Sequence, residues 1–524
     1  MATTNAAEPA APAGAAPAGA APAGAAQRRA GHSPSLASAV GTVGLLFLAG
    51  LVISEEPAGT RPGDWPMFGG TPGRNMVNTL VKNLPASWAV EKGELKNIKW
   101  MAQAGNKIYG GPVIAGGKVF IGTNNAFPRD TAVKGKKAVV MCFSEADGKF
   151  LWQIAHDIPN NQIFKEATEQ GLCSTPAVDG NRIYYVTPSC ELICADTADG
   201  KIKWSLDMMK KLDVVPFHLG NCSPLVIGDL VYAVTSNARD DGGQVPAPKA
   251  PSFVAVNKTS GEVVWKSNLP GLALIEGQWS NPCYAEIDGK GQVIFPGGDA
   301  VLYSFEPKTG TLIWKFDCNP GKPDPNAGNR KISNYIVSTP VIHDKRLYVG
   351  LGLYPEHPAP DSKFSYVLCL DITKKGDVSA RSLSGKNDGK SALIWAYGGP
   401  IDPQPKEGRL YEFGRTLSTA AVQGGLVYIS EEAGYLHCLD AKTGKKQWDH
   451  DFLSPIWGSP YWVDGKVYIG TDDGELFIFA HGKDKKLLEK INMDEQMQST
   501  PVAANGTLYV ATRSTVYAIG KKVQ

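Results

Sequence analysis

The sequence predicts an all-β ring of eight blades, each of them a four-stranded antiparallel sheet. Two repeated patterns support this prediction. In the first, a short apolar strand leads to an oxygen-bearing side chain, with glycine four residues later and tryptophan four residues after that, as in Asp440, Gly444 and Trp448. In the second, Ser-x-Pro-Val precedes a tight turn and a strand of alternating Val, Tyr and Ile, as in 499–510. Four strands in about forty to fifty residues are typical of a propeller blade.

Residues 1–35 are rich in Ala, Pro and Gly, which predicts a disordered cytoplasmic tail. The stretch from Leu36 to Ile53 is uncharged and long enough to span a bilayer. Arg28 and Arg29 precede this stretch and acidic residues follow it, so we expect a single-pass anchor in the cytoplasmic membrane (36–53) with the propeller in the periplasm. A cleaved signal peptide is the alternative.

Residues 54–97 form a linker and lead-in, and 98–521 are the expected propeller. Six units end in a tryptophan strand, Leu488 takes the tryptophan position of a seventh, and the last unit has no such strand. A lone strand at 98–102 precedes the first unit. We expect it to pair with the C-terminal blade and close the ring, which leaves no long exposed sheet edge.

Each part of the first pattern has a physical role. The Asp, Asn or Ser side chain accepts backbone N–H groups of the turn, and the glycine supplies a positive φ. The tryptophan fills the wedge between blades, and its indole N–H needs a partner, for which carbonyls of the next unit are available. The residues expected in this structural role are Trp100, Trp152, Trp204, Trp265, Trp314, Trp395 and Trp448.

Charge and cysteine content give no indication of nucleic-acid binding or of a metal site. A net charge of +2 gives no reason to expect nucleic-acid binding. Cys142, Cys194, Cys369 and Cys438 share one slot of the repeat and are expected in the core. Cys173 and Cys222 begin inner strands of adjacent blades, so a disulfide between them near the axis remains an open alternative. No His, Asp or Glu cluster has the spacing of a metal site, and no metal ligand is predicted.

Eight such units with Ser-x-Pro inner strands resemble the quinoprotein, or PQQ-like, repeat family, and 64–70 resembles the segment that often precedes these propellers. The resemblance covers Trp65 to Lys521 and implies an eight-bladed propeller. The family includes quinone-dependent dehydrogenases as well as non-enzymatic propellers of outer-membrane protein assembly. This chain is closest in character to the second group.

For the enzymes, the resemblance implies pyrroloquinoline quinone (PQQ) between a tryptophan and a disulfide of adjacent cysteines, a calcium ion held by Glu, Asn and Asp, and an Asp base. The chain has no Cys-Cys pair and no matching Trp-Asp-Tyr-Asp-like segment. In Trp448 to Asp451, which looks similar, the tryptophan belongs to the repeat. We therefore predict no catalytic residue and no cofactor, and keep a PQQ- and calcium-dependent alcohol or sugar dehydrogenase as the alternative.

A ligand or partner is expected at the axial channel, beside the loops that enter the inner strands. The residues in those loops are Tyr109, His218, Asn221, Gln278, Trp279, Asn334, Tyr335, Arg415, Trp457 and Gln498. Their aromatic faces and hydrogen-bonding groups suit a planar ligand or a peptide, although they could instead plug the channel. We expect a monomeric, extracytoplasmic, membrane-anchored scaffold that binds an envelope protein or peptide.

Overall fold

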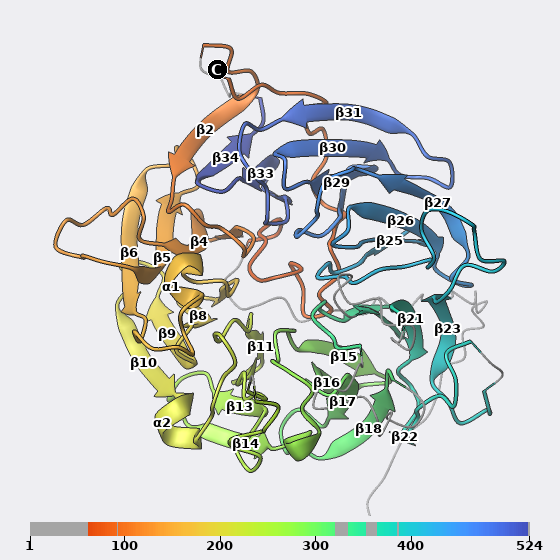
Figure 1. The fold of residues 1–524 in the computed structure, drawn as a ribbon. Coiled ribbons are helices and arrows are strands. Elements are labelled where there is room, and N and C mark those ends of the chain that lie inside the picture. The colour runs from red at the N-terminus through yellow and green to blue at the C-terminus, as the bar shows by residue number, and fades with distance from the viewer. Residues whose placement is uncertain are drawn as a thin grey trace, which may run out of the picture. The chain divides into compact units, whose positions relative to one another are not determined.

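Eight antiparallel sheets of four strands surround one axis, as expected (Figure 1). The computed structural model describes residues 61–91, 93–240, 242–319, 334–352, 364–384 and 387–521. The predicted tail and the predicted anchor at 36–53 lie outside these residues. Within the described ranges, no helix has the length and apolar character needed to cross a membrane.

The blades follow one another along the chain, and their strands run from the axis outward. The first four blades contain β3 (Val113–Ala115), β4 (Lys118–Asn124), β5 (Lys137–Ser144) and β6 (Phe150–Asp157); β7 (Ala177–Asp179), β8 (Arg182–Val186), β9 (Glu191–Asp196) and β10 (Ile202–Asp207); β11 (Leu225–Ile227), β12 (Leu230–Val234), β13 (Phe253–Asn257) and β14 (Val263–Ser267); and β15 (Cys283–Ile287), β16 (Lys290–Pro296), β17 (Val301–Phe305) and β18 (Leu312–Asp317).

The last four blades are built in the same way, and the described connections contain three short helices. The blades contain β19 (Val341–His343), β20 (Arg346–Leu351), β21 (Tyr366–Asp371) and β23 (Leu393–Gly398); β24 (Ala421–Gln423), β25 (Leu426–Ser430), β26 (Tyr435–Asp440) and β27 (Lys446–Asp451); β28 (Tyr461–Val463), β29 (Lys466–Gly470), β30 (Glu475–Ala480) and β31 (Leu487–Asn492); and β32 (Val502–Ala504), β33 (Thr507–Ala511) and β34 (Thr515–Ile519). The helices are α1 (Ala167–Gln170), α2 (Met208–Leu212) and η1 (Gly271–Ala273).

The N-terminal strand closes the ring. Strand β2 (Ile98–Gln103) pairs antiparallel with β34 and becomes the outer strand of blade 8. This confirms the expected pairing of the lone strand with the C-terminal blade. Two further short strands extend the sheets in parallel: β22 (Gly376–Asp377) covers the outer edge of blade 4, and β1 (Val77–Asn78) adds to blade 7 next to β28.

The repeated tryptophans join each blade to the next. Trp395 Nε1 donates to Ala441 O at 3.1 Å, and a Cβ on Gly444 would lie 2.6 Å from the same indole ring. Equivalent indole-to-carbonyl bonds, of 2.7–3.2 Å, occur at Trp100, Trp152, Trp204, Trp265 and Trp448. The expected bond to the next unit is therefore confirmed at six of the seven tryptophans.

Two blades depart from the pattern. Trp314 Nε1 donates to Gln292 Oε1 at 2.6 Å, and Gln292 Nε2 in turn donates to Ile372 O of the next blade at 3.0 Å. The side chain of Gln292 bridges the two blades because the next blade has a longer insertion at that point. The placement of Leu488 at a tryptophan position is wrong. Its hairpin turn is one residue longer, so Glu489 pairs with Ile478 at that register and Leu488 is exposed.

The lead-in segment, residues 61–81, is hydrogen bonded to all eight blades at the end of the ring that carries the turns between first and second strands. From blade 1 to blade 8, the bonds are Trp65 N to Ile114 O, Val178 N to Pro66 O, Arg74 Nη2 to Ser223 O, Tyr284 N to Pro72 O, Ile342 N to Gly73 O, Met76 N to Ala420 O, the β1–β28 pairing, and Asn78 Nδ2 to Ala503 O. The red to orange trace inside the ring in Figure 1 is this segment.

Arg74 is the most buried cation of the lead-in. Its side chain is fully buried, and its guanidinium donates to the carbonyls of Pro282, Phe68, Ser223 and Pro224 at 2.9–3.0 Å. Burial lowers the pKa of Arg74 to about 10, which still leaves it charged at neutral pH. These carbonyl oxygens therefore replace water around the buried charge, and no carboxylate of the described residues forms an ion pair with it.

The contact between Gly444 and Trp395 predicts an asymmetric response to alanine. Gly444 and Gly506 have φ values of +73° and +74°, but a Cβ on Gly506 would meet nothing within 4 Å. We expect Gly506→Ala to lose about 1 kcal/mol of unfolding free energy through its backbone alone. Gly444→Ala should lose about 1–3 kcal/mol more through the clash with the indole. Urea unfolding of both variants measures the difference, and equal losses would contradict the wedge role.

The burial of Arg74 predicts that the lead-in stabilises the ring. Arg74→Met should lower the free energy of unfolding by about 3–5 kcal/mol, because several buried carbonyls lose their donor. Arg61→Met, at an exposed position of the same segment, should change it by less than about 0.5 kcal/mol. The measurement is urea unfolding of the full chain, and a loss at Arg74 no larger than at Arg61 would overturn the assignment.

Candidate functional site

The Ser-x-Pro segments of neighbouring blades bond to one another around the axis. In seven of the eight segments, the middle residue accepts a hydrogen bond from the preceding blade or donates one to the following blade. These bonds are Thr175 N to Ser223 Oγ at 3.0 Å, Ser223 N to Asn281 Oδ1 at 2.6 Å, Asn281 Nδ2 to Thr339 Oγ1 at 2.7 Å, Thr419 N to Ser459 Oγ at 2.9 Å, and Ser459 N to Thr500 Oγ1 at 2.9 Å. The small polar residues therefore form an axial collar.

A cavity of about 230 Å³ lies inside this collar. Phe68 of the lead-in contributes to its wall, together with Tyr109, Gly110, Gln170, Cys173, Thr175, Leu219, Asn221, Ser223, Trp279, Asn281, Val337, Thr339, Leu417, Trp457, Gly458, Ser459, Gln498 and Thr500. Among the described residues, no Asp, Glu, Lys, Arg or His lines it. Burial raises the pKa of Tyr109 and of Cys173 to about 12 each, with Cys173 and Asp472 adding to the effect on Tyr109. The wall is therefore uncharged at neutral pH.

Half of the predicted axial residues come together in this wall. Tyr109, Asn221, Trp279, Trp457 and Gln498 all line the cavity, and the rings of Tyr109 and Trp457 lie 6.0 Å apart between centroids. They come from loops that lead into different inner strands, as the repeat pattern predicted. Their role in binding stays a prediction.

Four other predicted residues do not line the cavity and instead hold its loops. Gln278 donates to Asn237 O at 2.5 Å and accepts Gly298 N at 3.2 Å, while Asn334 donates to Phe364 O at 2.6 Å. Arg415 forms an ion pair with Glu432. Tyr335 packs its ring against Trp279, with 6.2 Å between centroids. All four side chains are buried, and Tyr335 is the one that contacts a residue of the cavity wall through its ring.

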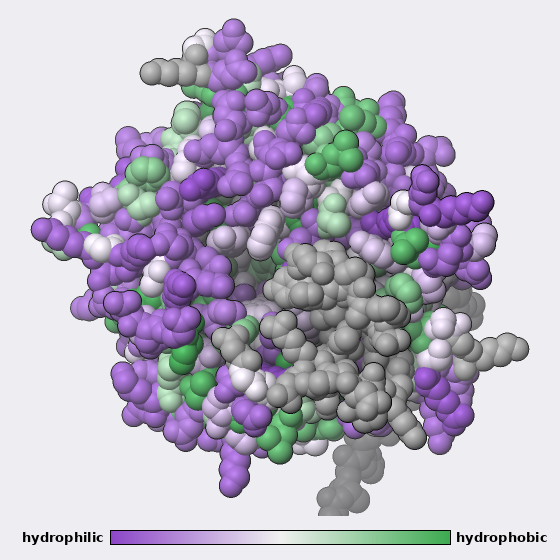
Figure 2. Space-filling view, in the orientation of Figure 1, coloured by the Kyte–Doolittle hydropathy of each residue, from purple (hydrophilic) through white to green (hydrophobic). Residues whose placement is uncertain are grey.

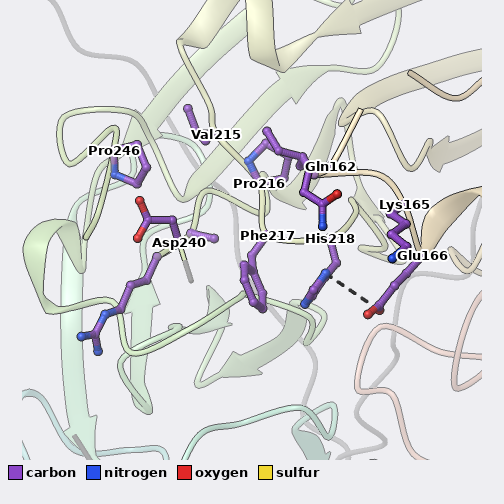
Figure 3. Close-up of a pocket in the computed structure, with 12 residues that line it drawn as sticks. Gln162, Lys165, Glu166, Val215, Pro216, Phe217, His218, Asp240 and Pro246 are labelled. Carbon is purple, nitrogen blue, oxygen red and sulfur yellow. Dashed lines mark ion pairs between the residues drawn. The ribbon is translucent and has the colours of Figure 1, made fainter. Parts of the chain in front are cut away.

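His218 lies in a second, larger cavity of about 440 Å³, shown in Figure 3. Its Nδ1 is 3.9 Å from Glu166 Oε2, and its ring packs 3.8 Å from that of Phe217. The backbone of His218 has a φ of +64°, which is strained for a residue with a side chain. The prediction that His218 lines the axial channel is therefore not met. Three loops of blades 1 to 3 form the second cavity, and the spacing of residues in the sequence does not show which loop residues turn toward it.

The sequence did contain a signal for the collar. The middle residue of Ser-x-Pro is Thr, Ser or Asn in seven of the eight units, and the exception is Gly111. A small polar residue at a fixed distance from a proline points to a shared environment. Phe68 carried no such signal, because the lead-in occurs once and has no repeat to compare it with.

The cysteines of the chain are free thiols. Cys142, Cys194, Cys369 and Cys438 are buried, which confirms their expected place in the core. The bond considered between Cys173 and Cys222 does not form. Ser174, next to Cys173, instead donates its hydroxyl to Cys222 O at 2.7 Å, so a hydrogen bond links these two inner strands.

The axial cavity does not suit PQQ with calcium. An anionic quinone needs cations near it, and calcium prefers carboxylate and carbonyl oxygens. The described part of the wall offers amides but no carboxylate. Two of those amides are already engaged: Asn281 with Ser223 and Thr339, and Gln498 with Asp472 at 3.1 Å. In the described part of the chain, no group of three or more His, Cys, Asp or Glu could hold a metal ion.

Comparison with known proteins gives a clear family and distant relatives. The family model described as outer membrane protein assembly factor BamB matches residues 136–352 and 374–519. Tetrathionate hydrolase of Acidithiobacillus ferrooxidans is 21% identical over 397 residues, which are 71% of this chain and 64% of the relative. Quinohemoprotein alcohol dehydrogenase ADH-IIG of Pseudomonas putida is 30% identical over 151 residues, 27% of this chain and 17% of that enzyme.

The solved structures are similar in fold. Quinohemoprotein alcohol dehydrogenase from Comamonas testosteroni superposes with a TM-score of 0.58 at 14% identity, covering 88% of this chain and 81% of that one. The chain spans less than two thirds of the length of the curated relatives that it matches. From the repeat, the blade geometry and the extent of the family match, the chain belongs to the PQQ-like repeat β-propeller family whose model is described as outer membrane protein assembly factor BamB.

Proposed function

We propose that this protein is a non-catalytic docking scaffold of the bacterial cell envelope. In this proposal, the segment from Leu36 to Ile53 anchors the chain in the cytoplasmic membrane, and the propeller works in the periplasm as a monomer. The description of the matching family as an outer-membrane assembly factor favours an envelope protein as the partner. The uncharged run and its flanking charges favour the anchor.

The observation that carries the proposal is the uncharged wall of the axial cavity. Dehydrogenation of an alcohol needs a base for the hydroxyl proton and an acceptor for the hydride. The described residues of the cavity wall supply neither a carboxylate nor a histidine, and burial keeps Tyr109 and Cys173 protonated. These properties favour binding over chemistry at the axis.

The loops around the cavity mouth provide the proposed contact surface. The connections from an outer strand to the next inner strand expose Leu453 (88%), Leu272 (76%), Leu410 (49%) and Ile163 (38%). Figure 2 shows hydrophobic side chains as separate spots on a mainly hydrophilic face. Interfaces between proteins that also exist apart are about as apolar as the rest of the surface, so this distribution suits a reversible partner.

The uncharged wall predicts a negative result with quinone. The full chain incubated with PQQ and calcium should show no bound-quinone absorption and no dye reduction with alcohols or sugars. A quinoprotein dehydrogenase reconstituted in the same way is the positive control. Stoichiometric quinone binding with turnover would contradict the proposed function and favour the dehydrogenase alternative.

The exposed leucines predict where a partner touches the propeller. A photo-crosslinking amino acid in place of Leu453 should give one discrete adduct with an envelope protein in cells, identified by mass spectrometry. The same substitution at Leu80, which is 64% exposed in the lead-in at the opposite end of the ring, is the matched control and should give no adduct.

A second substitution separates docking from chance proximity. Placing the crosslinker at Leu272 should label the same partner, because this residue lies in an equivalent loop on the same end of the ring. Adducts of equal yield at Leu80, or no adduct at Leu453, Leu272 and Leu410, would exclude this face as the docking surface.

A further inference from the structure

The axial cavity joins aromatic faces to neutral hydrogen-bonding groups. Trp279 and Trp457 are half-buried in its wall, and Tyr109 lies beside Trp457. The amide of Asn221 and the hydroxyls of Thr175 and Thr339 belong to the same wall. Flat apolar surfaces beside uncharged donors and acceptors suit a ligand with apolar C–H faces and several hydroxyl groups.

Several of these groups have no partner within the described residues. Asn221 Oδ1 is buried and accepts no hydrogen bond from any of them. The indole N–H groups of Trp279 and Trp457 likewise donate to none of the described residues, whereas Trp448 of the repeat donates to Gly482 O at 3.1 Å. A buried acceptor without a donor costs about 1–3 kcal/mol, which a ligand hydroxyl would recover.

The wall also selects against charge. An ion that entered the cavity would lose its hydration and meet no opposite charge among the lining residues. Asp472 is not a lining residue, and its carboxylate accepts a hydrogen bond at 3.1 Å from the amide of Gln498, which is one. A neutral ligand therefore fits better than an anion such as PQQ or a cation.

The size and the floor of the cavity limit the ligand further. Its volume of about 230 Å³ is below the usual range of about 300–1,000 Å³ for sites of drug-sized molecules. Phe68, which is part of the wall, belongs to a lead-in that bonds to every blade at one end of the ring. The site therefore takes a single ring or a chain end, and a continuous chain does not thread through it.

We propose that the axial cavity binds one neutral sugar ring, a hexopyranose that is either free or at the end of a glycan. Its C–H face packs on Trp457 or Trp279, and one of its hydroxyls donates to Asn221 Oδ1. This inference goes beyond the docking function and does not depend on it, because docking uses the exposed leucines of the surrounding loops.

Isothermal titration of the full chain tests the proposal. The probes are glucose, galactose, mannose and N-acetylglucosamine, each as the free sugar and as a short oligosaccharide, with glucuronate and glucosamine as charged analogues. At least one neutral sugar should bind with a Kd on the order of 1 mM or below, independently of sodium chloride. The oligosaccharide arm distinguishes a free sugar from a glycan end, and the charged analogues should bind at least tenfold more weakly.

Matched variants assign the binding to the cavity. Asn221→Leu removes the unpartnered acceptor with little change of volume, and Trp457→Ala removes a stacking face; each should weaken binding at least tenfold. Trp457→Phe should retain part of the affinity. Leu453→Ser, outside the cavity, should leave sugar binding unchanged while it weakens docking, so the two proposals fail independently. Thermal unfolding of each variant shows that the fold is kept.

Three outcomes would overturn the proposal. The first is the absence of millimolar binding by any neutral sugar of the panel. The second is binding that persists in both Asn221→Leu and Trp457→Ala. The third is tighter binding of glucuronate than of glucose, or displacement of the sugar by a neutral peptide that binds more tightly, which would make the site an anion or peptide site instead.

Discussion

The ring depends above all on one contact, in which a tryptophan of one blade donates to a carbonyl of the next; it occurs at six of the eight junctions between blades. At Trp265, the indole N–H donates to Pro307 O at 2.7 Å and the ring covers Gly310, whose φ is +68°. Tyr232 of the same blade donates its hydroxyl to the same carbonyl at 3.1 Å. One contact thus fills the wedge between sheets, satisfies two buried donors and fixes the turn of the neighbouring blade.

The lead-in adds a second constraint, which acts across the ring and not around it. A segment of about twenty residues makes hydrogen bonds with every blade, and the buried Arg74 reaches two blades with one guanidinium. Strand β2 adds a further link, because it pairs with β34 and so joins the N-terminal part of the propeller to its C-terminal blade. Contacts between residues so distant in sequence cost loop entropy, which many backbone hydrogen bonds together offset.

Features that repeat along the chain could be predicted from the sequence, whereas features that occur once could not. Eight blades, the closing strand and the indole bonds follow from a period that can be compared within one chain. Glu489 was missed because a turn one residue longer shifts the register without changing the spacing of apolar residues. Gln292, which replaces a carbonyl as the partner of Trp314, and Phe68 in the cavity wall have no equivalent elsewhere in the chain. Of the ten predicted axial residues, the loops place five at the cavity, because side-chain direction within a loop depends on tertiary contacts.

The axial cavity combines these results. The collar surrounds it, Phe68 of the lead-in is part of its wall, the loops contribute two tryptophans, and its wall has no charge among the described residues. A preformed, uncharged site favours binding of a neutral ligand and disfavours quinone chemistry. The most direct measurement is a crystal structure of the protein soaked with the tightest-binding sugar. The account predicts one sugar ring on the axis, stacked on Trp457 or Trp279 with a hydroxyl at Asn221 Oδ1. A sugar bound only elsewhere, or a quinone in the cavity, would contradict it.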